Sequence, residues 1–310
     1  MRKIAIIDIG TNSIKFCIAG KRENGGVDVL LDENDIARLG EGLRETGRIS
    51  EEALERNARC VAGFAGRARE QGVTEILAVG TQALRTARNS GDFIARVAEL
   101  SGVQVGVIPG EEEARLSYLA VLSALPVRDG ELVIFDTGGG STEFIFGRGR
   151  ELVRRFSVDL GAVRLTEEYF SEDPVKAGSA ARALADIKAR FDQAGVAGRP
   201  QQLVGMGGTV TSMGAVKHRM TSYDPDVIQG SALTREDVEE QIAAYEAKTL
   251  EQRRAMPGLQ PKRADVILAG ACIVKDILER FGAPQLTISD RGLRHGLAFD
   301  RFAGTGDHQL

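Results

Sequence analysis

Long apolar runs are absent from this sequence, and cysteine is scarce. A membrane-spanning helix needs about 20 consecutive apolar residues, whereas the apolar run at the N-terminus, Ile4–Ile7, stops at Asp8. A run this short predicts a buried strand rather than the core of a signal peptide. The 3 cysteines are far apart and show no C-x-x-C spacing. This argues against a disulfide framework or a zinc site and favours the reducing cytoplasm.

An excess of charge of one sign is also absent. The chain has 40 Lys and Arg residues against 44 Asp and Glu, a net charge of −4. This balance argues against a general polyanion binder, so we expect neither a nucleic acid nor a membrane as partner. An anionic substrate would have to meet positive charge that is gathered locally.

One glycine-rich segment, residues 133–147, reads VIFDTGGGSTEFIFG. An apolar run precedes the glycines and an alternating apolar pattern follows them, which predicts strand, tight turn and strand. A P-loop is excluded because no Gly-Lys-Ser/Thr follows and no helix pattern begins there. Glycines permit close approach to the backbone, and successive N–H groups can hold an anion. Taken alone, the segment is equally consistent with a plain hairpin.

The N-terminus repeats this segment. Residues 6–16 (IIDIGTNSIKF) align with residues 134–144 (IFDTGGGSTEF) at a constant offset of 128 residues. The repeat predicts two related domains whose hairpins face each other across a cleft and grip a phosphate chain. We place the domain boundary at the polar VRDGE segment, which gives domains 1–125 and 126–310.

The two copies differ at one informative position, where Lys15 in the first stands for Glu143 in the second. Asp136 and Glu143 together could hold Mg²⁺ or another divalent cation, because Mg²⁺ takes one or two carboxylates plus waters and substrate phosphates. Asp8 is a further candidate in the second coordination shell. Ser141 and Thr142 add hydroxyl donors to the turn.

Further motifs accompany the hairpins along nearly the whole chain. They are RLGEGLRETGRIS (38–50), GTQALRTARNS (80–90), GEEEAR (110–115), DLGAVRLTE (159–167), GMGGTVTS (205–212), KRADVILAGA (262–271) and GLRHGL (292–297). Together they resemble the exopolyphosphatase/guanosine pentaphosphate phosphohydrolase (Ppx/GppA) family of the sugar kinase/Hsp70/actin (ASKHA) superfamily, in its short two-domain form. The resemblance implies an α/β fold of two duplicated ribonuclease-H-like (actin-like ATPase) domains with a cleft between them.

The resemblance also implies roles for individual residues. It identifies Glu113 as the catalytic base, a choice that composition cannot make among Glu111, Glu112 and Glu113. We expect Arg85 to bind phosphate beside a helix N-terminus. A third glycine turn lies in the motif GMGGTVTS (205–212). It could face the phosphates or simply place Thr209 as a helix N-cap. The full expected phosphate-binding set is Gly10, Thr11, Asn12, Ser13, Lys15, Arg85, Gly138, Gly139, Gly140, Ser141, Thr142, Gly207, Gly208 and Thr209.

For the reaction, the resemblance implies Mg²⁺-dependent hydrolysis of terminal phosphoanhydride bonds of inorganic polyphosphate, with water activated by Glu113. Hydrolysis of guanosine pentaphosphate (pppGpp) to ppGpp, a non-catalytic guanosine-nucleotide sensor and a kinase stay open as alternatives. The helical domain of longer members is not expected here, so short polyphosphate chains and a homodimer stay open too. Six residues have no assigned role at this point: Lys262, Arg263, Arg291, Arg294, His218 and His295.

Overall fold

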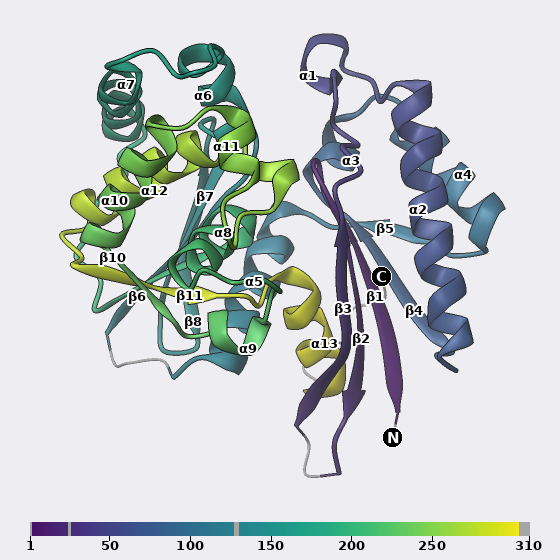
Figure 1. Cartoon of the computed structure of the whole chain (residues 1–310). Helices are drawn as coiled ribbons and strands as arrows, with labels where there is room; N and C mark the ends of the chain where they lie inside the picture. The colour runs from purple at the N-terminus through teal and green to yellow at the C-terminus, as the bar shows by residue number, and fades with distance from the viewer. Residues whose placement is uncertain (1, 24–25, 127–129, 304–310) are drawn as a thin grey trace. The chain divides into compact units, whose positions relative to one another are not determined.

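The computed structural model describes residues 2–23, 26–126 and 130–303. The chain divides into two compact units, one formed by Met1–Ser123 with Arg291–Leu310 and the other by Ala124–Asp290 (Figure 1). Each unit has its own sheet and its own covering helices. No helix of the described residues is both long enough and apolar enough to cross a membrane.

The first unit is built on a five-stranded sheet in the order β3-β2-β1-β4-β5. Strand β1 pairs antiparallel with β2 and parallel with β4. The elements of this unit are β1 Lys3–Ile9, β2 Ile14–Lys21, β3 Val27–Asp35, α1 Leu43–Thr46, α2 Glu51–Glu70, β4 Glu75–Gly80, α3 Gln82–Thr86, α4 Ser90–Ser101, β5 Val105–Val107, α5 Gly110–Ala124 (whose last residue falls in the second unit) and α13 Leu293–Ala303.

The second unit is built on a six-stranded sheet in the order β10-β11-β9-β6-β7-β8. Strand β6 pairs antiparallel with β7 and parallel with β9. Its elements are β6 Glu131–Thr137, β7 Thr142–Arg148, β8 Glu151–Val158, α6 Ala162–Tyr169, α7 Ser179–Gln193, β9 Gln202–Met206, α8 Gly207–Lys217, α9 Pro225–Ile228, β10 Ala232–Thr234, α10 Arg235–Glu246, α11 Leu250–Arg254, the 3₁₀ turn η1 Pro261–Arg263, α12 Ile267–Arg280 and β11 Gln285–Ser289.

The structure confirms the internal repeat. The order β3-β2-β1-β4-β5 of the first sheet corresponds to β8-β7-β6-β9-β11 of the second. In the first hairpin Asp8 lies opposite Lys15, and in the second Asp136 lies opposite Glu143. These positions are the ones that the offset of 128 residues relates, so the two hairpins share one register as well as one motif.

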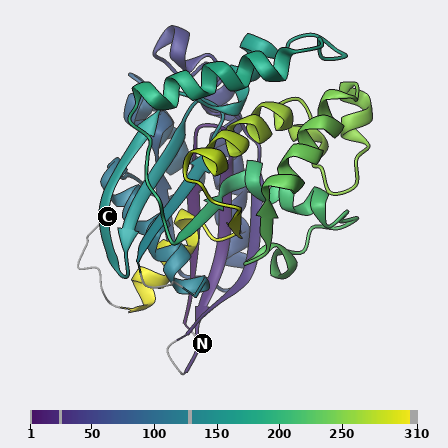
Figure 2. The ribbon, with the colours of Figure 1, turned by 90° about the vertical axis from the view of Figure 1, so that its left-hand side faces the viewer.

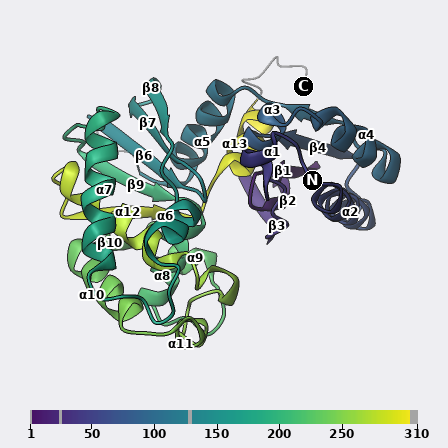
Figure 3. The ribbon, with the colours of Figure 1, turned by 90° about the horizontal axis from the view of Figure 1, so that it is seen from above.

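The first sheet is buried on both faces, which explains the continuous apolar run of β1. Ala5 and Ile7 point into the cluster that includes residues of α2, whereas Ile4 and Ile6 point into the cluster that includes residues of α13. Successive side chains of a strand alternate between faces, so one strand supplies both cores. Viewed from above, α2 and α4 lie on one side of this sheet and α13 on the other (Figure 3).

Aromatic side chains join the second sheet to its helices. Phe144 of β7 contacts Phe191 of α7, with ring centroids 5.5 Å apart, and Phe281, which directly follows α12. Helices α7 and α12 therefore pack over one face of this sheet, and Figure 2 shows them side by side. A capping box at Thr234 starts α10.

The C-terminal helix corrects the expected domain limits. Residues 126–310 were expected to form one domain, but Arg291–Leu310 groups with the first unit. Helix α13 buries Leu293, Leu297 and Phe302 in the cluster that contains Ile4 and Ile6. An apolar helix face must be covered, and β1 offers the uncovered apolar face within the same unit.

We expect a pair of helical glycines to respond oppositely to alanine. A Cβ on Gly296 of α13 would lie 1.8 Å from the Leu116 carbonyl oxygen of α5, so Gly296→Ala should lower the free energy of unfolding by about 1–3 kcal/mol. A Cβ on Gly63 of α2 meets nothing within 4 Å, so Gly63→Ala should raise it by about 0.5–1 kcal/mol. Urea denaturation measures both. Equal effects of the two substitutions would contradict the packing of α13 on α5.

Candidate functional site

The first hairpin turn keeps a row of peptide N–H groups without acceptors. The Gly10 N–H donates to the Ser13 carbonyl at 3.0 Å, and the Thr11 and Asn12 carbonyls accept from the N–H groups of Gly40 (2.8 Å) and Arg38 (2.9 Å). Within residues 2–23, 26–126 and 130–303, the N–H groups of Thr11, Asn12 and Ser13 donate to nothing. Successive N–H groups left free in a turn can form an anion-binding concavity.

The second turn has the same construction with a different neighbour. The Gly138 N–H donates to the Ser141 carbonyl at 2.9 Å, and the Gly139 carbonyl accepts from Val163 at 2.9 Å. The start of α6 lies so close that a Cβ on Gly161 would sit 2.4 Å from the Gly139 carbonyl. Among the described residues, the N–H groups of Gly139, Gly140 and Ser141 have no acceptor. Gly161 lies in the motif DLGAVRLTE, but only the fold shows that it packs against this turn.

Glu113 lies in the first turn of α5 and faces Arg85. Its Oε2 atom is 2.8 Å from Arg85 Nη1, which also donates to the Ile108 carbonyl at 2.9 Å. The neighbouring Glu112 pairs instead with Arg115, at 2.7 Å, and Arg115 also bonds Asp300. The structure thus separates two adjacent glutamates that composition cannot distinguish.

Four charged groups of the first unit act on one another at this place. Burial raises the pKa of Glu113, the Arg85 charge and hydrogen bond lower it, Asp8 raises it and Lys15 lowers it, with a net rise above the ordinary value. Lys15 Nζ itself is 3.8 Å from Asp8 Oδ2. About a third of the Glu113 side chain (32%) stays exposed, so water can reach it. A carboxylate with a raised pKa is suited to accept a proton.

Arg85 sits differently from the expectation. It was expected beside the N-terminus of a helix, but it lies in the last turn of α3, a helix of only 5 residues. Thr81 takes the N-cap position, yet its hydroxyl donates to the Ile9 carbonyl instead of capping the helix. The guanidinium is oriented by Glu113 and the Ile108 carbonyl rather than by a helix dipole.

In the second unit, Asp136 and Glu143 form a cross-strand pair on one face of the hairpin. Glu143 Oε1 accepts from the hydroxyls of Ser141 at 2.5 Å and Ser157 at 3.0 Å. No group of three or more His, Cys, Asp or Glu side chains in the described part of the chain could hold a metal by itself. Two carboxylates could hold Mg²⁺ only if waters and substrate phosphates complete the shell.

The third glycine turn packs against charged groups. Helix α8 begins at Gly207, and Thr209 does not cap it, because its hydroxyl donates to the Thr137 carbonyl at 3.1 Å. Gly207 has φ +82°, and a Cβ there would lie 2.0 Å from Asp136 Oδ1. A Cβ on Gly208 would lie 2.2 Å from the Arg263 guanidinium. The two glycines thus leave room for a carboxylate and a guanidinium.

Arg263 therefore belongs to the candidate site, although the sequence left its role open. Burial lowers the pKa of Arg263, and the charge of Asp136 opposes this effect. A guanidinium close to Asp136 adds positive charge where a phosphate and a divalent cation are expected.

Two further residues whose roles the sequence left open, Arg294 and His295, contact Asp32. Arg294 binds Asp32 through two hydrogen bonds of 2.7 and 2.8 Å, and His295 Nε2 lies 2.8 Å from the same carboxylate. Burial lowers the pKa of His295 to about 3, so the ring is neutral and helps to tie α13 to β3. His218 and Lys262 are exposed.

The two sheets with their shared hairpin define an α/β fold of the actin-like type, as predicted. Residues 17–303 match the Ppx/GppA phosphatase family, and the chain belongs to that family. The crystal structure of the Aquifex aeolicus family member superimposes with a TM-score of 0.86 at 32% identity, covering 99% of both chains. The family and the fold class expected from the motifs are thereby confirmed.

Two relatives carry different names. A Mycobacterium tuberculosis protein named exopolyphosphatase 2 is 33% identical over 314 residues, which cover 96% of this chain and 98% of that protein. A Photobacterium profundum protein named guanosine-5′-triphosphate,3′-diphosphate pyrophosphatase is 31% identical over 99% of this chain and 60% of that protein.

Substitution of Gly207 tests the close packing of the third turn. Gly207→Ala should lower the free energy of unfolding by about 1–3 kcal/mol, because alanine is strained at φ +82° and its Cβ would displace Asp136. Gly140→Ala is the matched control, since a Cβ there meets nothing within 4 Å. Differential scanning calorimetry compares the two. A Gly207→Ala protein as stable as Gly140→Ala would contradict this packing.

Proposed function

We propose that the protein is an exopolyphosphatase that hydrolyses the terminal phosphoanhydride bond of inorganic polyphosphate and releases orthophosphate. The observation that carries the proposal is the Glu113 carboxylate, which lies 2.8 Å from Arg85 and has a raised pKa. The charges of Asp8 and Lys15 on the first hairpin also act on this pKa. Family membership and the name of the M. tuberculosis relative support the same activity.

In the proposed reaction, Glu113 accepts a proton from water while the water oxygen attacks the terminal phosphorus. The bond from that phosphorus to the bridging oxygen breaks, and the shortened chain leaves with the electron pair. Arg85 and Lys15 bind phosphate oxygens, and so do the free N–H groups of both turns. Phosphoryl transfer depends mainly on such positioning and charge neutralisation.

A divalent cation is part of the proposal. Asp136 and Glu143 would hold it, and the cation would neutralise charge on the phosphate oxygens. The hydroxyls of Ser141 and Ser157 orient Glu143 for this task. Asp8 is a further candidate, in the second coordination shell of the cation, and its observed neighbour is Lys15.

Hydrolysis of pppGpp is the second candidate function, favoured by the P. profundum relative. The reacting group is again a terminal phosphoanhydride, so the same residues would carry the chemistry.

We also propose that the protein acts in the cytoplasm. Its 3 cysteines are unpaired, which agrees with a reducing compartment.

Adjacent glutamates provide a sharp test of the catalytic base. Glu113→Gln should lower kcat for phosphate release roughly 100-fold and leave KM nearly unchanged, because the carboxylate is used in the transition state. Glu112→Gln is the matched control and should keep kcat, since Glu112 pairs with Arg115. Phosphate release is measured with Mg²⁺ on long polyphosphate, short polyphosphate and pppGpp.

The same measurement separates the candidate functions. Release from polyphosphate that is lost in Glu113→Gln supports the exopolyphosphatase, and release from pppGpp alone supports the nucleotide hydrolase. No release from any substrate, together with tight guanosine-nucleotide binding, would make the protein a sensor and overturn the proposal.

The charge of Arg85 should set the pH dependence. An opposite charge lowers the pKa of a carboxyl group, and Arg85 lowers that of Glu113. Arg85→Gln should therefore raise the pKa of Glu113 further, and the acidic limb of the kcat/KM profile should move to higher pH. A profile that keeps its acidic limb in place would show that Glu113 is not the group that titrates.

A further inference from the structure

Arg38 has a backbone conformation that arginine rarely adopts. Its φ is +50°, in the left-handed region, and the only other non-glycine residue of this kind in the described chain is Arg219. Glycine or asparagine adopts this region at lower cost. A strained residue is retained only where its surroundings impose the conformation, and such residues gather at functional sites.

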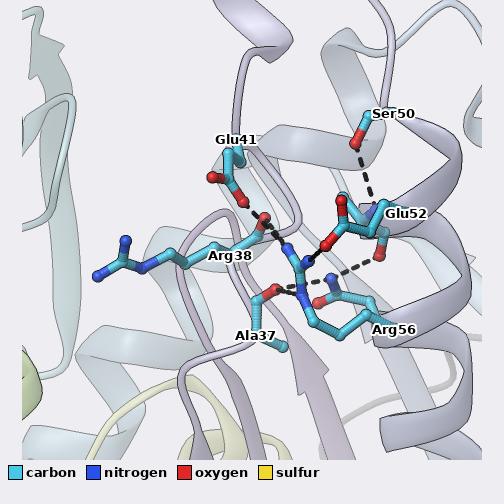
Figure 4. A network of polar contacts seen from close by, with 8 residues as sticks. Ala37, Arg38, Glu41, Ser50, Glu52 and Arg56 are labelled. Carbon is cyan, nitrogen blue, oxygen red and sulfur yellow. Dashed lines mark hydrogen bonds and ion pairs between the residues drawn. The ribbon is translucent and has the colours of Figure 1, made fainter.

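Two sets of contacts impose it. On one side, the Arg38 N–H donates to the Asn12 carbonyl of the first hairpin turn at 2.9 Å. On the other side, helix α2 holds the preceding residue, because Arg56 Nε (3.0 Å) and Asn57 Nδ2 (2.9 Å) both donate to the Ala37 carbonyl. Arg56 also bonds Glu41 at 3.1 Å (Figure 4).

The Arg38 side chain takes no part in this network. Its guanidinium points away from Arg56 and Glu41 in Figure 4 and is exposed. Among the described residues it has neither a hydrogen bond nor an ion pair. The network therefore fixes the backbone of an arginine whose charged end is left for another molecule.

We propose that Arg38 binds a phosphate group of the substrate, next to the phosphate held by the N–H groups of Thr11, Asn12 and Ser13. This inference rests on the proposed function of that turn. Because the Arg38 N–H donates to the Asn12 carbonyl, the Arg38 side chain branches from the backbone directly beside the turn. A guanidinium can donate to two phosphate oxygens at once. The ligand class is a chain of at least two linked phosphates.

The test compares Arg38→Gly, Arg38→Asn and Arg38→Lys with a control. Glycine and asparagine tolerate the left-handed backbone and remove the charge, whereas lysine keeps the charge. Arg48→Ala is the control, because Arg48 is an exposed arginine of the same segment whose partner, Asp92, is 3.9 Å away and itself exposed. The readouts are KM and kcat for tripolyphosphate, and Kd for tripolyphosphate by calorimetry.

We expect Arg38→Gly and Arg38→Asn to raise KM and Kd about tenfold with kcat within about twofold, and to show no fall in melting temperature. Arg38→Lys should restore part of the affinity, and added salt should weaken binding less in the neutral variants than in the unchanged protein. Arg48→Ala should match the unchanged protein.

Two failures are distinguishable. If the unchanged protein releases phosphate but Arg38→Gly and Arg38→Asn keep its KM and Kd, the role of Arg38 is wrong and the exopolyphosphatase proposal stands. If no phosphate is released but tripolyphosphate binds with an affinity that depends on Arg38, the hydrolase proposal fails and the binding role of Arg38 stands.

Discussion

The structure depends on one constraint, which is that the carbonyl groups of each hairpin turn are tied to a neighbouring segment while the N–H groups are left free. In the first unit the neighbour is the loop at Arg38 and Gly40, and in the second it is the start of α6. Unpaired backbone donors are costly when buried, so such a turn is tolerable where an anion or water meets it. The close approach needs residues without side chains, and this explains Gly40 and Gly161, whose Cβ atoms would collide with the turns.

The charges around the first turn counteract one another. Asp8 and burial favour the protonated form of Glu113, while Arg85 and Lys15 favour the ionised form. A carboxylate paired only with Arg85 would be a poor proton acceptor, because ion pairing lowers its pKa. Partial burial restores basicity without removing access to water. Arg85 and Lys15, which lower the pKa of Glu113, are also the cations suited to bind phosphate. Binding of an anion to them would therefore weaken this lowering and raise the pKa of Glu113.

Much of this could be predicted from the sequence because the repeat fixes geometry. Two copies of a motif at one offset imply equal strand register, and the opposed pairs Asp8–Lys15 and Asp136–Glu143 follow from it. The family resemblance selects Glu113 as the base, which stays a proposal; the structure shows its pairing with Arg85 and its raised pKa. What could not be predicted depends on contacts between distant segments. The place of α13 in the first unit is set by an uncovered face of β1, and the closeness of Arg263 to Gly208 is set by the path of the chain between α8 and η1.

The two copies of the repeat share one hairpin backbone but carry different charged side chains at an equivalent position. The hairpin register is identical, so position 15 and position 143 present their side chains at equivalent places. Lysine in the first unit adds a cation beside the carboxylate of Asp8, and the neighbourhood becomes suited to a base and to phosphate. Glutamate in the second unit adds a second carboxylate beside Asp136, held by Ser141 and Ser157, and the neighbourhood becomes suited to a divalent cation. A single exchange at one register position therefore agrees with a proposed base in one unit and proposed metal ligands in the other.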